Sequence, residues 1–159
     1  MITAYLGIGS NQSRSHNIRA ALQWLEQCYD SLQCSPIYET DPVGVECKRF
    51  YNLVVAIQTD QPLVELYRAL RQLEQRQGRC RDTENPCHTL DVDILLYGDV
   101  SGTVSGVELP RPEILTNAYV LKPLSDLAPE LTHPEVGKTY RQLWWEYDRP
   151  QKLWPVEFR

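Results

Sequence analysis

The order of hydrophobic patterns along the chain is the feature that most narrows the possible folds. Apolar or alternating runs, which predict strands, lie at 3–11, 32–40, 50–59 and 90–97. Apolar residues spaced three and four apart, which predict amphipathic helices, follow the first run, from Ser15 to near Asp30, and the third run, from Pro62 to Gly78. The predicted order is therefore strand, helix, strand, strand, helix, strand.

This order is typical of a ferredoxin-like βαββαβ core, an α+β fold in which an antiparallel sheet carries both helices on one face. We expect the other face to stay free for a ligand. C-terminal additions would follow: a hairpin around 102–106, a proline-rich stretch at 109–115, a helix over 117–127 and a tail that contains three tryptophans. We find no repeat or linker, so we predict a single domain over 1–159.

Composition and charge exclude several classes of protein. Hydrophobic residues make up 42% of the chain and charged residues 23%, as in ordinary soluble globular proteins. A net charge of −5 argues against nucleic acid and against an anionic membrane surface as partners. No run approaches the roughly 20 apolar residues of a membrane span, and the first residues lack the pattern of a signal peptide. We expect a cytoplasmic monomer whose partners are small molecules.

The cysteines give no sign of a disulfide framework or a zinc site. Five are present, an odd number, and none is spaced as CxxC. They are Cys28, Cys34, Cys47, Cys80 and Cys87. We expect free thiols, and we expect Cys28 and Cys34 to pack as small apolar groups.

Two carboxylates interrupt the most apolar predicted strand, "TLDVDILLYG". Because side chains alternate along a strand, Asp91 and Asp93 share a face, with Cα atoms about 6.5 to 7 Å apart. At that spacing they can reach one cation or bracket two, and without a cation they repel each other. The alternative is an exposed sheet face on which both acids are merely solvated.

Arginines gather where the second predicted helix ends. Arg79 and Arg81 enter a polar segment, 78–89, that has no periodicity, and long loops of this kind are functional or disordered. Positive charge beside paired aspartates suits a magnesium-bound polyphosphate. For Arg71 and Arg76 we prefer a simpler interpretation, a solvated helix end that stabilises the negative pole of the helix.

An aromatic slot could hold a flat heterocycle. Phe50, Tyr51 and Asn52 begin the third predicted strand, and Tyr119 begins the late helix. A heterocycle could stack between two rings while the amide of Asn52 binds its edge. Taken singly, each aromatic side chain fits a hydrophobic core equally well.

Together these motifs resemble one known family. The segments "LGIGSN", "YETDPVG" with "FYNLVVAI", "LEQRQGRCR", "HTLDVDILLYGD" and "LPRPEILTNAYVLKPLSDLAPEL" are similar, in order, to the pyrophosphokinase of folate synthesis that acts on 6-hydroxymethyl-7,8-dihydropterin. The resemblance covers 2–131. It implies transfer of the terminal pyrophosphoryl group of ATP to the pterin hydroxymethyl oxygen, release of AMP, and the use of two Mg²⁺ ions.

The resemblance also implies a role for individual residues. The metal ligands would be Asp91 and Asp93. The pterin would lie among Thr40, Asp41, Pro42, Val43, Phe50, Asn52 and Tyr119. The nucleotide would contact Glu74, Arg79, Arg81 and Arg111, and the catalytic cations would be Arg79, Arg81, His88 and Arg111. The segment 78–89 would then act as a lid.

Four positions depart from the family pattern, and all four handle the triphosphate or the lid in that family. Asn85 replaces an aromatic residue, His88 an arginine, Arg111 a histidine and Asn117 an arginine. Two alternatives therefore stay open: a non-catalytic or repurposed paralogue that binds a pterin-like ligand, and a ferredoxin-like regulatory module that binds a small ligand without chemistry. A nucleotidyltransferase fits badly, because about 80 residues separate Ser10 from the acidic pair.

Overall fold

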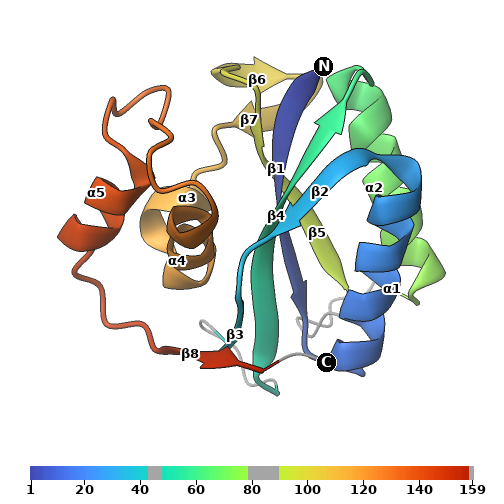
Figure 1. The fold of residues 1–159 in the computed structure, drawn as a ribbon, viewed down its shortest axis with the longest axis horizontal. Coiled ribbons are helices and arrows are strands. Elements are labelled where there is room, and N and C mark those ends of the chain that lie inside the picture. The colour runs from blue at the N-terminus through green and yellow to red at the C-terminus, as the bar shows by residue number, and fades with distance from the viewer. Residues whose placement is uncertain (43–47, 79–89, 158–159) are drawn as a thin grey trace.

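One antiparallel sheet forms the centre of the protein (Figure 1). The computed structural model describes residues 1–42, 48–78 and 90–157. Five strands lie side by side in the order β5 (Asp91–Tyr97), β1 (Ile2–Ser10), β4 (Phe50–Thr59), β3 (Ile37–Thr40) and β8 (Leu153–Val156). A sixth strand, β2 (Asp30–Cys34), pairs with the far half of β4. Each of these pairings is antiparallel.

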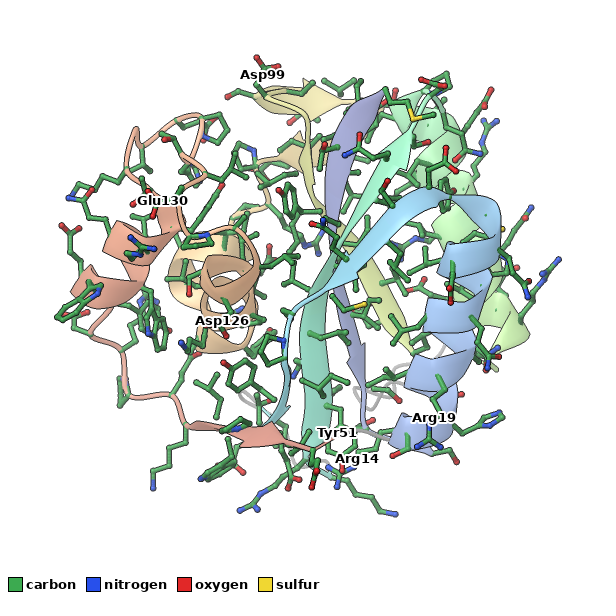
Figure 2. The ribbon with its side chains drawn as sticks, viewed as in Figure 1. Arg14, Arg19, Tyr51, Asp99, Asp126 and Glu130 are labelled. Carbon is green, nitrogen blue, oxygen red and sulfur yellow. The ribbon has the colours of Figure 1, made fainter. Side chains whose placement is uncertain are left out.

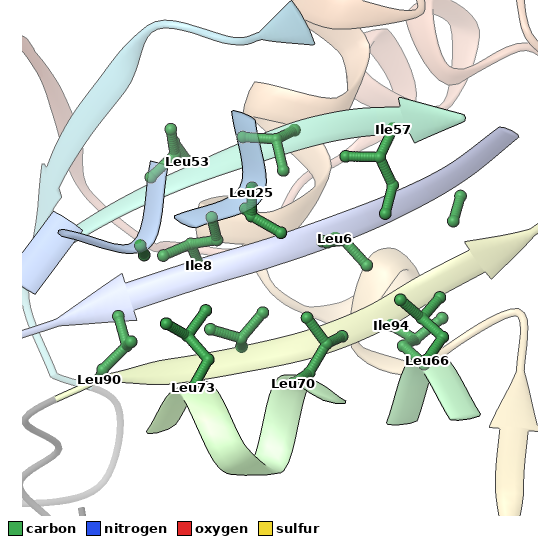
Figure 3. Close-up of a cluster of buried hydrophobic side chains, with 14 of the residues drawn as sticks. Leu6, Ile8, Leu25, Leu53, Ile57, Leu66, Leu70, Leu73, Leu90 and Ile94 are labelled. Carbon is green, nitrogen blue, oxygen red and sulfur yellow. The ribbon is translucent and has the colours of Figure 1, made fainter. Parts of the chain in front are cut away.

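Two helices cover one face of the sheet, α1 (Arg14–Cys28) and α2 (Leu63–Arg76). Their apolar stripes pack on the strands in one buried cluster (Figure 3). In α2 the stripe contains the four leucines spaced as a helix requires, Leu63, Leu66, Leu70 and Leu73. The βαββαβ core with both helices on one face is therefore as predicted.

The C-terminal additions occupy part of the opposite face, which we had expected to stay free. The short helix α3 (Glu113–Thr116), α4 (Ala118–Leu127) and α5 (Tyr140–Glu146) lie on that side (Figure 1). They bury a second apolar cluster that includes Val54 of β4 and Leu95 of β5. The expectation was wrong for this part of the sheet because the strands carry apolar side chains on both faces, and the second face also has to be covered.

Two further segments differ from the prediction. The run at 32–40 is two strands, β2 and β3, which separate at Ser35 and Pro36. There the amide N–H of Ser35 donates to the carbonyl of Val54, and its hydroxyl accepts from the amide of Val54. The tail adds β8, which no periodic pattern indicated. The predicted hairpin is present as β6 (Gly102–Val104) and β7 (Val107–Leu109).

The cysteine prediction was half right. Cys28 and Cys34 are free thiols, but both are exposed, so the expectation that they pack as apolar groups was wrong. Cys28 ends α1 and Cys34 ends β2, a strand whose residues lie mostly in solvent. Cys47, Cys80 and Cys87 lie outside the described residues. Within the described ranges, no helix is both long and apolar enough for a membrane span.

Candidate functional site

Three neighbouring strands form the floor of a hollow. In the sheet register Gly9 of β1 lies between Asp91 of β5 and Asn52 of β4, and Gly7 lies beside Asp93. Alternation places all five residues on the face that carries α4. Because the two glycines have no side chains, β1 places no side chain between the carboxylates and the amide. The hollow is small, about 60 Å³, and opens to solvent.

Gly9 has no room for a side chain. A Cβ atom at this position would lie 2.5 Å from Oδ1 of Asn52, whereas for one at Gly7 the nearest atom would be a Leu95 methyl carbon at 3.4 Å. Glycine in a strand often marks such a close approach. The alternating glycines of "LGIGS" are therefore a sequence signal for this close approach.

The amide of Asn52 is buried and oriented by the protein. Its Nδ2 donates to Oγ1 of Thr40 at 2.7 Å, which leaves Oδ1 above Gly9. Phe50 lies on the same face, with Cδ1 3.8 Å from the Cβ position of Gly9. Tyr51 points to the other face, where its ring lies 3.9 Å from the guanidinium of Arg14 (Figure 2). Tyr51 thus lies outside the slot that Phe50 and Asn52 share.

Tyr119, in the first turn of α4, separates this hollow from a neighbouring one. Its hydroxyl accepts a hydrogen bond from Nδ2 of Asn117 at 3.0 Å. Burial raises the pKa of Tyr119, and the carboxylates of Asp91, Glu113 and Asp93 raise it further. The phenol is therefore protonated at neutral pH and faces the acidic pair.

The neighbouring hollow measures about 350 Å³ and opens between the end of β3, the start of α4 and the tail. It is lined by Thr40, Asp41, Pro42, Ala118, Tyr119, Pro150, Gln151 and Lys152. The structure therefore brings most of the predicted pterin residues into two adjoining hollows. Val43 lies outside the described residues. Gln151 and Lys152 were missed, because nothing in a nonperiodic tail indicates where it returns to the body of the protein.

The acidic pair lines the first hollow and does not lie on a plain exposed sheet face. The side chain of Asp93 is 21% exposed, and its Oδ1 lies 3.7 Å from the guanidinium groups of both Arg71 and Arg111. Carboxylate oxygens are the ligands that Mg²⁺ prefers. Within the described part of the chain, no three His, Cys, Asp or Glu side chains converge. The pair therefore fits Mg²⁺ that also keeps phosphate or water oxygens.

Arg111 brings a cation to the same hollow. Its amide donates to the carbonyl of Leu95 at 3.0 Å, which fixes the loop after β7. Its Nε lies 3.2 Å from Oε2 of Glu113, and its Nη2 lies 3.7 Å from Oδ1 of Asp93. Glu113 also lines the hollow, although no pattern in the sequence indicates it.

Arg71 and Glu74 do not lie at a solvated helix end. The side chain of Arg71 is 17% exposed and reaches the outer edge of β5, so our interpretation of this residue was wrong. Arg76 is exposed, as expected. Glu74 is 1% exposed, and its carboxylate binds Arg71 and the amide of Val92. A contact between Glu74 and a nucleotide stays a prediction, as do the roles of Arg79, Arg81 and His88, which lie outside the described residues together with Asn85.

Fold and site together define a small α+β protein in which a hollow with a fixed amide adjoins an acidic pair and an arginine. The sequence model of the 7,8-dihydro-6-hydroxymethylpterin-pyrophosphokinase family matches residues 5–129. The chain belongs to this family.

Two bacterial relatives agree with this assignment. The 2-amino-4-hydroxy-6-hydroxymethyldihydropteridine pyrophosphokinase of Pseudomonas aeruginosa is 37% identical over 135 residues, which cover 82% of this chain and 83% of that protein. The protein of the same name from Bacillus subtilis is 33% identical over 132 residues, or 80% of this chain and 79% of that protein.

The same unit is part of longer proteins. The folic acid synthesis protein FOL1 of Dictyostelium discoideum is 32% identical over 142 residues, which cover 87% of this chain but 22% of that protein. The crystal structure of Plasmodium falciparum HPPK-DHPS with SDX-DHP superposes with a TM-score of 0.75 over 92% of this chain and 44% of that chain. At 16% identity this superposition shows a shared fold.

Proposed function

We propose that the protein transfers the pyrophosphoryl group of ATP to the hydroxymethyl group of 6-hydroxymethyl-7,8-dihydropterin, a step of folate synthesis. One observation carries the proposal: Asp91, Gly9 and Asn52 form a row across three strands, and all three line the same hollow. A ring bound at the amide would extend toward the acidic pair. Family membership and the names of the relatives supply the chemistry.

The pterin would lie on the floor of the first hollow. Since Nδ2 of Asn52 is bound to Thr40, Oδ1 is the oriented acceptor for the amino edge of the ring. Phe50 and Tyr119 would contact its faces. Thr40, Asp41, Pro42 and Val43 would lie along the rim beside Tyr119.

Asp91 and Asp93 would hold two Mg²⁺ ions together with the phosphates of ATP. Magnesium supplies charge neutralisation at the phosphate oxygens. Arg111 would add positive charge from the loop after β7, and Arg79, Arg81 and His88 would add more from the segment that follows α2. The resemblance puts Glu74 near the nucleotide, where it would act from behind the acidic pair.

The reaction needs alignment and charge stabilisation, and no covalent nucleophile of the protein. A bond forms between the pterin hydroxymethyl oxygen and the β-phosphorus of ATP. The bond from that phosphorus to the oxygen shared with the α-phosphate breaks, AMP leaves, and the hydroxyl proton passes to solvent. We place this activity in a cytoplasmic monomer that acts on small molecules, without nucleic acid or membrane partners.

A second candidate function is a pterin-binding paralogue without turnover. One contact favours it: Asn117, where the resemblance leads us to expect an arginine, donates its amide to the hydroxyl of Tyr119 and offers no charge to a phosphate. The third hypothesis, a regulatory module that binds a small ligand, would show no dependence on magnesium.

One set of measurements separates these candidates. We expect AMP to form from ATP, Mg²⁺ and the hydroxymethyl pterin, and we expect calorimetry to show pterin binding that is stronger with Mg²⁺ and a non-hydrolysable ATP analogue. Asp91→Asn and Asp93→Asn should each abolish magnesium-dependent nucleotide binding and leave the fold intact. Pterin binding without AMP would favour the paralogue, and unchanged nucleotide affinity in both variants would contradict the assignment of the acidic pair.

A further inference from the structure

The outer edge of β5 is paired with side chains. β5 is the last strand on its side of the sheet, and an edge strand usually presents unpaired N–H and C=O groups. At Val92 the amide donates to Oε2 of Glu74 at 2.8 Å, and the carbonyl accepts from Nη2 of Arg71 at 2.7 Å. Two side chains of α2 thus bind both polar groups of one strand residue, as a neighbouring strand would.

Val92 is the residue between the two aspartates. Its amide belongs to the peptide plane after Asp91, and its carbonyl belongs to the peptide plane before Asp93. Fixing both planes fixes the directions of the two Cα–Cβ bonds on the opposite face of the strand. Arg71 also lies 3.7 Å from Oδ1 of Asp93, so it acts on the carboxylate directly as well.

Arg71 and Glu74 also bind each other. Nη1 of Arg71 donates to Oε1 of Glu74 at 2.8 Å, and the guanidinium lies 4.7 Å from the centre of the Tyr67 ring. Glu74 is 1% exposed and ends an otherwise apolar stripe of α2. Well-packed apolar residues often replace a buried ion pair without loss of stability. General stability therefore does not explain why these two charges are buried behind the acidic pair.

We propose that Arg71 and Glu74 are positioning residues that orient Asp91 and Asp93 toward a divalent cation. This inference rests on the proposed function, because it takes the acidic pair as the cation site. Residues that orient metal ligands from behind typically change metal affinity by about 10- to 100-fold when they are replaced. Neither residue needs to touch the cation or the substrates.

The test uses a variant that keeps the net charge. Arg71→Met/Glu74→Met removes one positive and one negative charge together with all three hydrogen bonds, and it preserves much of the side-chain volume. Glu65→Met/Arg68→Met makes the same change on the exposed side of α2 and is the control. Mn²⁺ affinity is measured by electron paramagnetic resonance, with and without a non-hydrolysable ATP analogue, and pterin affinity by calorimetry.

We expect the Arg71→Met/Glu74→Met variant to bind Mn²⁺ about tenfold more weakly, with pterin affinity within about twofold of the parent and the control unchanged. Arg71→Lys keeps one donor for the carbonyl of Val92 and should fall between the two. Unchanged Mn²⁺ affinity in the folded double variant would overturn the inference, as would an equal loss of pterin affinity.

Two remaining outcomes are also decisive. If the double variant does not fold, Arg71→Lys carries the test: weaker Mn²⁺ binding at a native melting temperature supports the inference, and unchanged binding overturns it. If the parent protein forms AMP and the double variant binds Mn²⁺ as tightly as the parent, only this inference is overturned. If the parent protein binds no Mn²⁺, both this inference and the proposed function are overturned.

Discussion

At the scale of single residues, the hollow depends on Gly9. In Gly9→Ala the new Cβ would lie 2.5 Å from Oδ1 of Asn52, and the amide would have to leave its bond with Thr40. We expect the free energy of unfolding to fall by about 1–3 kcal/mol and pterin affinity to fall at least tenfold, measured by urea denaturation and calorimetry.

Gly7→Ala is the matched control for this substitution. The same strand and the same face are changed, but the nearest atom is a flexible Leu95 methyl group at 3.4 Å. Its unfolding free energy should change by less than that of Gly9→Ala. Equal losses of unfolding free energy in the two variants would show that replacing any glycine of this strand is destabilising, whether or not the new Cβ meets Asn52.

Asn52 and Phe50 should contribute unequally to pterin binding. Asn52→Ala removes an oriented acceptor and leaves a buried polar edge unpaired, which costs about 1–3 kcal/mol. Phe50→Leu removes a stacking contact worth about 0.5–1.5 kcal/mol. Calorimetry with the hydroxymethyl pterin should therefore show a larger loss for Asn52→Ala, and the reverse order would count against a ring bound at this amide.

At the scale of secondary structure elements, the tail supports the start of α4. Oε1 of Gln151 accepts from the amide of Ala118 at 2.7 Å, and Nε2 donates to the carbonyl of Thr116 at 3.2 Å. The side chain of Asn117, at the position before the helix, makes no capping bond. A side chain from a distant segment thus accepts the hydrogen bond that an N-cap side chain would usually accept.

Gln151→Ala should therefore weaken both α4 and the site. We expect a loss of about 1 kcal/mol in unfolding free energy, the usual cost of a lost cap. Because α4 carries Tyr119, we also expect weaker pterin binding. Gln23→Ala, at an exposed position of α1, is the control for a glutamine that makes no such contact in the described structure. A stability loss without a change in pterin affinity would show that Tyr119 does not contribute to pterin binding.

The elements that could be predicted from sequence are those with a local pattern. The leucine stripe of α2 and the alternation in β5 are repeated signals, and each specifies both an element and its buried face. β8 is short, contains Pro155, and forms only because β3 offers a partner edge. Arg71 could not be placed for a similar reason: its partner is an edge carbonyl of a strand 21 residues away, and a helix-end arginine has the same local sequence whether or not that edge is near.

At the scale of the whole molecule, buried tyrosines should make the protein sensitive to alkali. Tyr140 is fully buried in the cluster under α4, and burial raises its pKa above the usual value. Burial also raises the pKa of Tyr29 to about 12. Each of these tyrosines is protonated in both the folded and the unfolded state below about pH 10. Above that pH the tyrosines ionise first in the unfolded chain. Stability should thus be full below pH 10 and fall as pH rises further.

Tyr140→Phe should reduce this alkaline loss. Within the described residues the Tyr140 hydroxyl has no hydrogen-bond partner, so removing it should leave stability at neutral pH unchanged or higher. Urea denaturation at about pH 8 and about pH 11 measures the effect through the linkage of protonation and folding. Tyr67→Phe, at an exposed position, is the control and should keep the alkaline loss of the parent.

The row of Asp91, Gly9 and Asn52 ties ligand recognition to strand register. Along β1 the residues that open the hollow alternate with Leu6 and Ile8, which fill the core on the other face. Inserting one residue before this alternation would turn isoleucine into the ligand space and glycine into the core. Binding and folding would then fail together, whereas an insertion in the hairpin between β6 and β7 would leave the register intact. A lineage of such proteins can therefore vary its loops freely, but it can change the floor of its site only by exchanging side chains in place.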